Sequence, residues 1–147
     1  MNFGFSFVGA VFLIMLFIPN IIWNSYRPIG HSSEGENKIL RILEKIGQVL
    51  VVFFSLFCGN DFSLVVVISA ILMILYEIYW IRYFRSNLTL KDMYGNLGII
   101  MVPGASLPVL AFLCLGIACY NPLLIISSII LGIGHIGIHL NHKKEIQ

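Results

Sequence analysis

The histidines near the C-terminus are the clearest candidates for chemistry in this chain. His135 and His139 are four residues apart, and His142 follows three residues later. Steps of four and three place all three on one face of a helix. Two imidazoles at this spacing can reach one metal ion, so His135 and His139 are metal candidates. The residues between them do not form an HExxH motif, and we assign neither a metal nor a cofactor.

Glu77 is the clearest acidic candidate, because it lies inside an otherwise apolar segment. An ionisable side chain at membrane depth is costly unless protein groups or water receive it. His135 is similarly deep, about two helical turns inside its own segment. An acid and an imidazole can act as general acid and base, so Glu77 and His135 are the candidate catalytic residues. The competing interpretation is that they only hold neighbouring helices together.

Other polar and aromatic side chains are expected near the same depth. Pro19 loosens the helix that ends near Asn20, and helical spacing places Glu44 and Gln48 on one face. The candidate ligand-binding residues are Asn20, Glu44, Gln48, Tyr76, Trp80, Ser106 and His139.

These residues must be positioned by helices in a membrane. Hydrophobic residues make up 59% of the 147-residue chain and charged residues only 11%, whereas soluble domains carry roughly 25% charged residues. A span needs about 20 mostly apolar residues. The second segment meets this only if its helix begins at the charged stretch near Lys38. We predict an all-α, polytopic bundle of five transmembrane helices in a single domain, with spans at about 3–23, 38–59, 62–84, 97–120 and 123–140.

The basic residues predict how the bundle is oriented. With five spans, all nine Lys and Arg lie on one side or at its edge, and the positive-inside rule makes this side cytoplasmic. The N-terminus is then outside, the C-terminus cytoplasmic, and the chain a multi-pass protein of the plasma (inner) membrane. No basic patch with interleaved aromatic residues is present, so we expect the lipid bilayer, and no nucleic acid, as a partner.

Three further features concern packing. Pro103 and Pro108 predict a kinked or broken fourth helix, and such breaks often line a cavity. Cys58 and Cys119 both fall near outer helix ends and could form a disulfide, although packing as unpaired apolar residues is the favoured interpretation. Ser128-x-x-x-Gly132 could pack closely against a second copy in a homo-oligomer.

The unusual residues all fall in the inner half of their segments, while the outer halves are almost purely apolar. We therefore predict a polar pocket that faces the cytoplasm. A first interpretation is binding or transport of a small solute, ion or lipid. A second is a membrane enzyme that acts on a lipid or isoprenoid at the inner leaflet with Glu77 and His135. A third is a structural or regulatory subunit without chemistry of its own.

Overall fold

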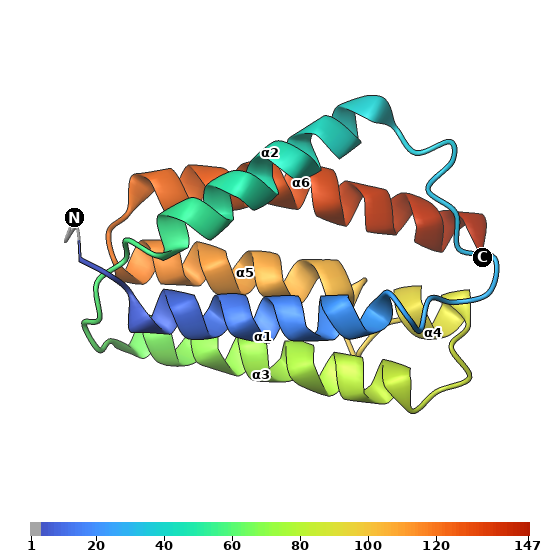
Figure 1. Cartoon of the computed structure of the whole chain (residues 1–147), viewed down its shortest axis with the longest axis horizontal. Helices are drawn as coiled ribbons and strands as arrows, with labels where there is room; N and C mark the ends of the chain where they lie inside the picture. The colour runs from blue at the N-terminus through green and yellow to red at the C-terminus, as the bar shows by residue number, and fades with distance from the viewer. Residues whose placement is uncertain (1–3) are drawn as a thin grey trace.

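The computed structural model describes residues 4–147, and this part of the chain is helical throughout apart from its connections. The all-α fold class predicted from composition is thus confirmed. α1, α3, α5 and α6 run along one long axis, and α2 is inclined to them (Figure 1). The helices are α1 (Phe7–Trp23), α2 (Lys38–Ser55), α3 (Leu64–Phe84), α4 (Leu90–Tyr94), α5 (Pro103–Ala118) and α6 (Pro122–Glu145).

Several helix bounds differ from the prediction. α5 begins at Pro103, so the prediction that Pro103 kinks a longer helix is wrong. Proline fits the first helical turn, where its missing N–H is not needed. Residues 97–102 instead form a tight turn, closed by paired Leu97–Ile100 hydrogen bonds of 3.0 Å. Pro108 does lie inside α5. Phe3, the predicted start of the first span, is outside the described residues.

Two helices, α3 and α6, are long and apolar enough to cross a membrane by length and composition. α1 and α5 are apolar but shorter, with 17 and 16 residues. The 18 residues of α2 include Lys38, Arg41, Glu44 and Lys45. Membrane association is therefore supported by two helices, and the five-span arrangement remains a prediction.

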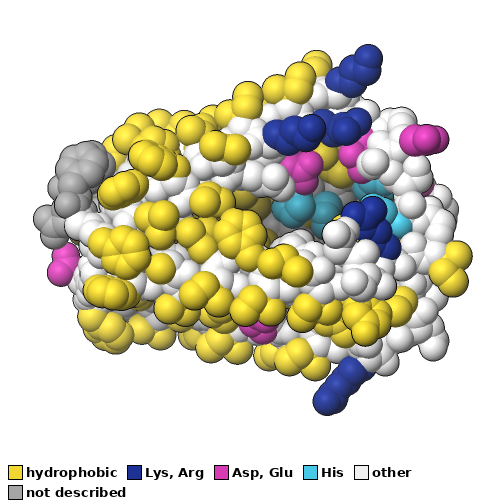
Figure 2. Space-filling view, in the orientation of Figure 1, with side chains coloured by type: hydrophobic (Ala, Val, Ile, Leu, Met, Phe, Trp, Pro, Cys, Tyr) yellow, Lys and Arg dark blue, Asp and Glu magenta, His cyan; other side chains and the backbone are white. Residues whose placement is uncertain are grey.

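The Lys and Arg side chains gather at one end of the bundle. This basic end is formed by the C-terminal ends of α1, α3 and α6, by the start of α2 and by α4 (Figure 1). The space-filling view shows the visible Lys and Arg side chains there, while apolar side chains cover the flank (Figure 2). At the opposite end, Cys58 and Cys119 form a disulfide. The favoured interpretation of these two as unpaired packing residues is therefore wrong.

The most extensive helix contact joins α2 to α6, and it is a close one. A Cβ atom at Gly47 would lie 2.5 Å from the Cα of Leu131, and one at Gly134 would lie 2.6 Å from the Leu40 carbonyl oxygen. Neither position can accept a side chain without moving backbone. Small residues of this kind allow membrane helices to approach closely. The contact places α2 and its Glu44 directly against the face of α6 that carries the histidines.

The face of α6 that carries Ser128 and Gly132 packs against other helices of the same molecule. Ser128 is fully buried, and its hydroxyl donates to the Leu124 carbonyl at 2.8 Å. A Cβ at Gly132 would lie 3.1 Å from a Val109 methyl on α5. This face therefore covers α5 of the same molecule, and a homo-oligomer, if one forms, would use another surface.

α1 and α2 touch at only one end. The Ser6 amide donates to the Leu56 carbonyl at 2.8 Å, and Gly9 lies against the backbone of Ser55. From this contact the two helices diverge toward the basic end (Figure 1). The surface between them is hollowed, with histidine side chains visible on its floor (Figure 2). The divergence therefore opens the interior of the bundle at its side.

The α2–α6 contact gives the first testable prediction. Gly134→Ala should lower the free energy of unfolding by about 1–3 kcal/mol, the usual cost of overpacking, because its methyl group meets the backbone of α2. Gly137→Ala is the matched control, since its methyl group meets only the flexible end of the Leu40 side chain. Reversible unfolding in detergent, followed by circular dichroism, measures both. Equal stability of the two variants would contradict the close contact.

Candidate functional site

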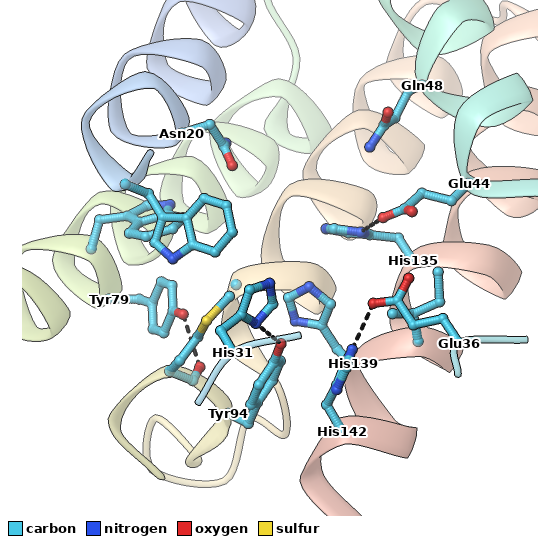
Figure 3. Close-up of a pocket in the computed structure, with 15 residues that line it drawn as sticks. Asn20, His31, Glu36, Glu44, Gln48, Tyr79, Tyr94, His135, His139 and His142 are labelled. Carbon is cyan, nitrogen blue, oxygen red and sulfur yellow. Dashed lines mark hydrogen bonds and ion pairs between the residues drawn. The ribbon is translucent and has the colours of Figure 1, made fainter. Parts of the chain in front are cut away.

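All four histidines of the chain line one cavity at the basic end. The cavity has a volume of about 230 Å³ and lies between α1, α2, α3, α5 and α6, with α4 and the α1–α2 loop contributing to its wall. Figure 3 shows Glu36 and Glu44 on one side of this space and Asn20 and Tyr79 on the other. We call it the polar pocket. Its lining residues are Asn20, Trp23, His31, Glu36, Glu44, Gln48, Tyr79, Trp80, Met93, Tyr94, Gly104, His135, Ile138, His139 and His142.

The innermost carboxylate–imidazole contact of the polar pocket joins α2 to α6. Glu44 Oε1 lies 2.5 Å from His135 Nδ1, and both side chains are about one-fifth exposed. α2 starts at Lys38 because the Asn37 side chain accepts the amide hydrogens of Ile39 and Leu40. With the start fixed and α2 held against Gly134, Glu44 is directed at the imidazole. A carboxylate on one ring nitrogen fixes the tautomer and the orientation of the ring.

A second contact of the same kind lies nearer the surface. Glu36, in the loop between α1 and α2, places Oε1 2.7 Å from His142 Nε2 and Oε2 3.8 Å from Arg41 Nε. From the same loop, His31 Nδ1 lies 3.4 Å from the Tyr94 hydroxyl. These contacts hold the loop over the outer part of the polar pocket, so the loop forms its roof at the basic end.

His139 lies between these two contacts. Its ring centroid is 4.5 Å from that of His135 and 5.2 Å from that of Tyr94. Its Nδ1 is buried and has no hydrogen-bond partner among the described residues. Within that part of the chain, no group of three His, Cys, Asp or Glu side chains has the geometry to hold a metal ion. The arrangement is thus one of carboxylate–imidazole pairs around an unpaired imidazole.

An apolar groove of about 260 Å³ continues from the polar pocket toward the middle of the bundle. It shares three lining residues with the pocket, namely Asn20, Gln48 and His135. The other residues that line the groove are Leu16, Phe17, Val51, Val52, Tyr76, Pro108, Phe112 and Leu131. A polar compartment and an apolar one therefore meet at His135, and both lie where α1 and α2 diverge.

Most of the candidate residues from the sequence line one of these two cavities. Glu44, Trp80 and His139 line the polar pocket, and Tyr76 lines the groove. The Tyr76 hydroxyl accepts a hydrogen bond of 2.8 Å from the Asn20 amide. These side chains come from α1, α2, α3 and α6, so the site combines segments that are far apart in the sequence.

Glu77 and Ser106 are not part of this arrangement. Glu77 lines neither cavity, and its Oε1 has no hydrogen-bond partner in the described chain. The structure therefore does not bring Glu77 to His135, and Glu44 is the carboxylate beside that imidazole. Ser106 also lines neither cavity, since its hydroxyl donates to the Met101 carbonyl at 2.6 Å and holds the start of α5.

The sequence did not single out several residues of the polar pocket. His31 and Glu36 lie in a loop with ordinary turn composition, and Tyr94 lies in the short α4. Only the chain topology could have indicated these residues. In a five-span chain, the α1–α2 connection and the α3–α5 connection both return to the end of the bundle where His139 and His142 lie. Helical spacing alone cannot show that a loop folds back over a pocket.

Comparisons with known proteins give no further indication. No protein-family model, curated protein or solved structure matches this chain. Function must therefore be inferred from the site itself.

The roof of the pocket gives a prediction on pH. Burial, and then the neighbouring His142 and Arg27, hold the pKa of His31 below its usual 6.5, with Glu36 offsetting part of the effect. Below pH 6.5 the unfolded chain thus binds a proton at this position more readily than the folded chain. The contribution of His31 to stability is full above pH 6.5 and is lost as the pH falls below it.

The His31→Asn variant should therefore lose less unfolding free energy than the natural protein between pH 7.5 and pH 5. Unfolding titrations in detergent at several pH values measure this difference. A variant whose pH dependence is as steep as that of the natural protein would show that the folded chain does not disfavour the His31 imidazolium.

Proposed function

We propose that this chain is a five-span membrane protein that binds a lipid, with the lipid head group in the polar pocket and an acyl chain in the apolar groove. The supporting observation is that the two cavities share Asn20, Gln48 and His135. A ligand that fills both must be polar at one end and apolar at the other. Lipids of the bilayer have this composition and surround the opening.

The five spans in this proposal are α1, α2, α3, α5 and α6. α1 and α5 are about 24–26 Å long at 1.5 Å per residue, a little less than a hydrocarbon core of about 30 Å. Apolar residues outside the helices, such as Ile99 before α5, extend the apolar length. α2 crosses at a tilt, with Lys38, Arg41 and Lys45 reaching toward the head groups.

The two ends of the bundle support an orientation with the basic end in the cytoplasm. Lys and Arg collect on the cytoplasmic side of membrane proteins. The opposite end carries the Cys58–Cys119 disulfide, and disulfides persist in oxidising compartments outside the cytosol. Charge and cysteine chemistry are independent features, and they favour the same orientation. The polar pocket would then lie in the inner leaflet.

Lipid binding suits the geometry better than passage of a small solute. Beyond the groove, the bundle toward the disulfide end is filled by core side chains that include Phe12 and Leu115, both buried. A lipid needs no path through this packing, because it can enter sideways between α1 and α2. Transport remains a prediction that only flux measurements can address.

Filling the groove tests the proposal. Val52 lines the groove, whereas Val49 lies on the same helix with its side chain exposed on the outer surface. Val52→Trp should weaken lipid binding at least about tenfold, equivalent to about 1.4 kcal/mol, because the indole occupies the space of the acyl chain. Val49→Trp is the matched control and should bind normally.

Native mass spectrometry of the detergent-purified protein, titrated with 1,2-dioleoylglycerol and with its diether analogue, measures retained lipid. Circular dichroism confirms that both variants remain folded. Equal lipid retention by the two folded variants would contradict binding in the groove, and so would the absence of any retained lipid on the natural protein.

A further inference from the structure

His135 has the arrangement of a general base. Its Nδ1 is occupied by Glu44 Oε1 at 2.5 Å, and an ionised carboxylate accepts hydrogen bonds but donates none. The proton of the neutral ring then lies on Nδ1, which leaves the lone pair on Nε2. The ring extends from α6 into the space between the helices (Figure 3). A carboxylate–imidazole pair of this kind activates water or a hydroxyl group in many hydrolases.

The position of His135 indicates which bond of a bound lipid lies beside its ring. His135 lines both the polar pocket and the apolar groove, so its ring lies where a bound lipid changes from head group to acyl chain. In a glycerolipid, the atoms at this point are those of the acyl ester. The reactive nitrogen and the ester carbonyl are therefore expected at the same depth.

The charges of the pocket select the head group. Its lining includes the carboxylates of Glu36 and Glu44, and no Lys or Arg is among the described lining residues. Phosphate is normally bound by Arg or Lys, and two carboxylates would repel it. Hydroxyl groups, by contrast, can donate to carboxylates and accept from imidazole or amide N–H groups. The pocket thus fits a neutral head group that carries hydroxyls.

We propose that this protein hydrolyses the acyl ester of a neutral glycerolipid, with His135 as the general base and Glu44 as the residue that positions it. The proposal rests on the lipid-binding function proposed above. His135 Nε2 removes a proton from water while the water oxygen attacks the ester carbonyl carbon. The carbonyl π electrons move to oxygen, and the ionised Glu44 stabilises the imidazolium that forms.

Gln48 is placed to stabilise the resulting oxyanion. Its side chain lines both cavities, and its side-chain amide has no hydrogen-bond partner in the described chain. When the intermediate collapses, the carbon–oxygen bond to glycerol breaks, and the leaving oxygen takes the proton from His135. The products are a fatty acid and a glycerolipid with one more hydroxyl group, so water is the only co-reactant.

The experiment uses the full chain in liposomes that contain 1,2-dioleoylglycerol, in water enriched in ¹⁸O. We expect released oleate to carry one ¹⁸O atom, measured by mass spectrometry. Glu44→Gln and His135→Gln should lower kcat by about 10²–10⁴-fold, the usual contribution of general-base catalysis. Glu34→Gln, in the exposed α1–α2 loop and outside both cavities, is the matched control and should keep full activity.

The diether analogue separates failure of this proposal from failure of lipid binding. It has no ester, so it measures lipid binding separately from turnover. In both site variants the fall in kcat should far exceed any fall in affinity for the diether. Diether binding without oleate release by the natural protein would refute hydrolysis and leave lipid binding intact. The absence of diether binding would refute both. Release of oleate from phosphatidylglycerol but not from dioleoylglycerol would refute the neutral substrate class.

Discussion

The close contact of α2 with α6 is the constraint on which the site depends. Gly47 and Gly134 let two backbones approach to a distance that any side chain would prevent. Because α2 lies so near, Glu44 reaches His135, and the loop that precedes α2 brings Glu36 to His142. If the helices were separated by an ordinary side chain, both carboxylates would be withdrawn from their imidazoles. Partly buried ionisable groups would then lack partners, which is costly inside a protein.

α1 contributes in the opposite way, by keeping its distance from α2. The two helices meet near Ser55 and then diverge, so the interior is closed at the disulfide end and open at the side toward the basic end. The same divergence exposes the polar pocket and the groove together. In the proposed function, the tightly packed α2–α6 pair would hold the carboxylate–imidazole contacts in place, and the loosely packed α1 would let a lipid enter from the bilayer.

The sequence predicted much of the fold but less of the site. Low charge and long apolar segments indicated an all-helical chain, and the periodicity of His135, His139 and His142 indicated their common face. The partner of His135 could not be predicted, because it depends on glycines of two helices that each pack against the backbone of the other helix, more than eighty residues away in the sequence. Glu77 was the more conspicuous acid by hydropathy, yet a helix has several faces, and depth alone does not tell which face a residue occupies. The starting residue of α5 was missed because Pro103 suits a first turn as well as a kink.

A photoreactive lipid tests the central claim, which is that one lipid occupies the pocket and the groove together. The probe is a dioleoylglycerol analogue with a diazirine at mid-chain, and the residues that it labels are read from peptide mass spectra after irradiation in liposomes. The account predicts labels on the groove residues Leu16, Val52 and Phe112, and their loss when unlabelled dioleoylglycerol is in excess. Labels confined to outward-facing residues such as Ile14 and Ile71, with no competition by the unlabelled lipid, would contradict it.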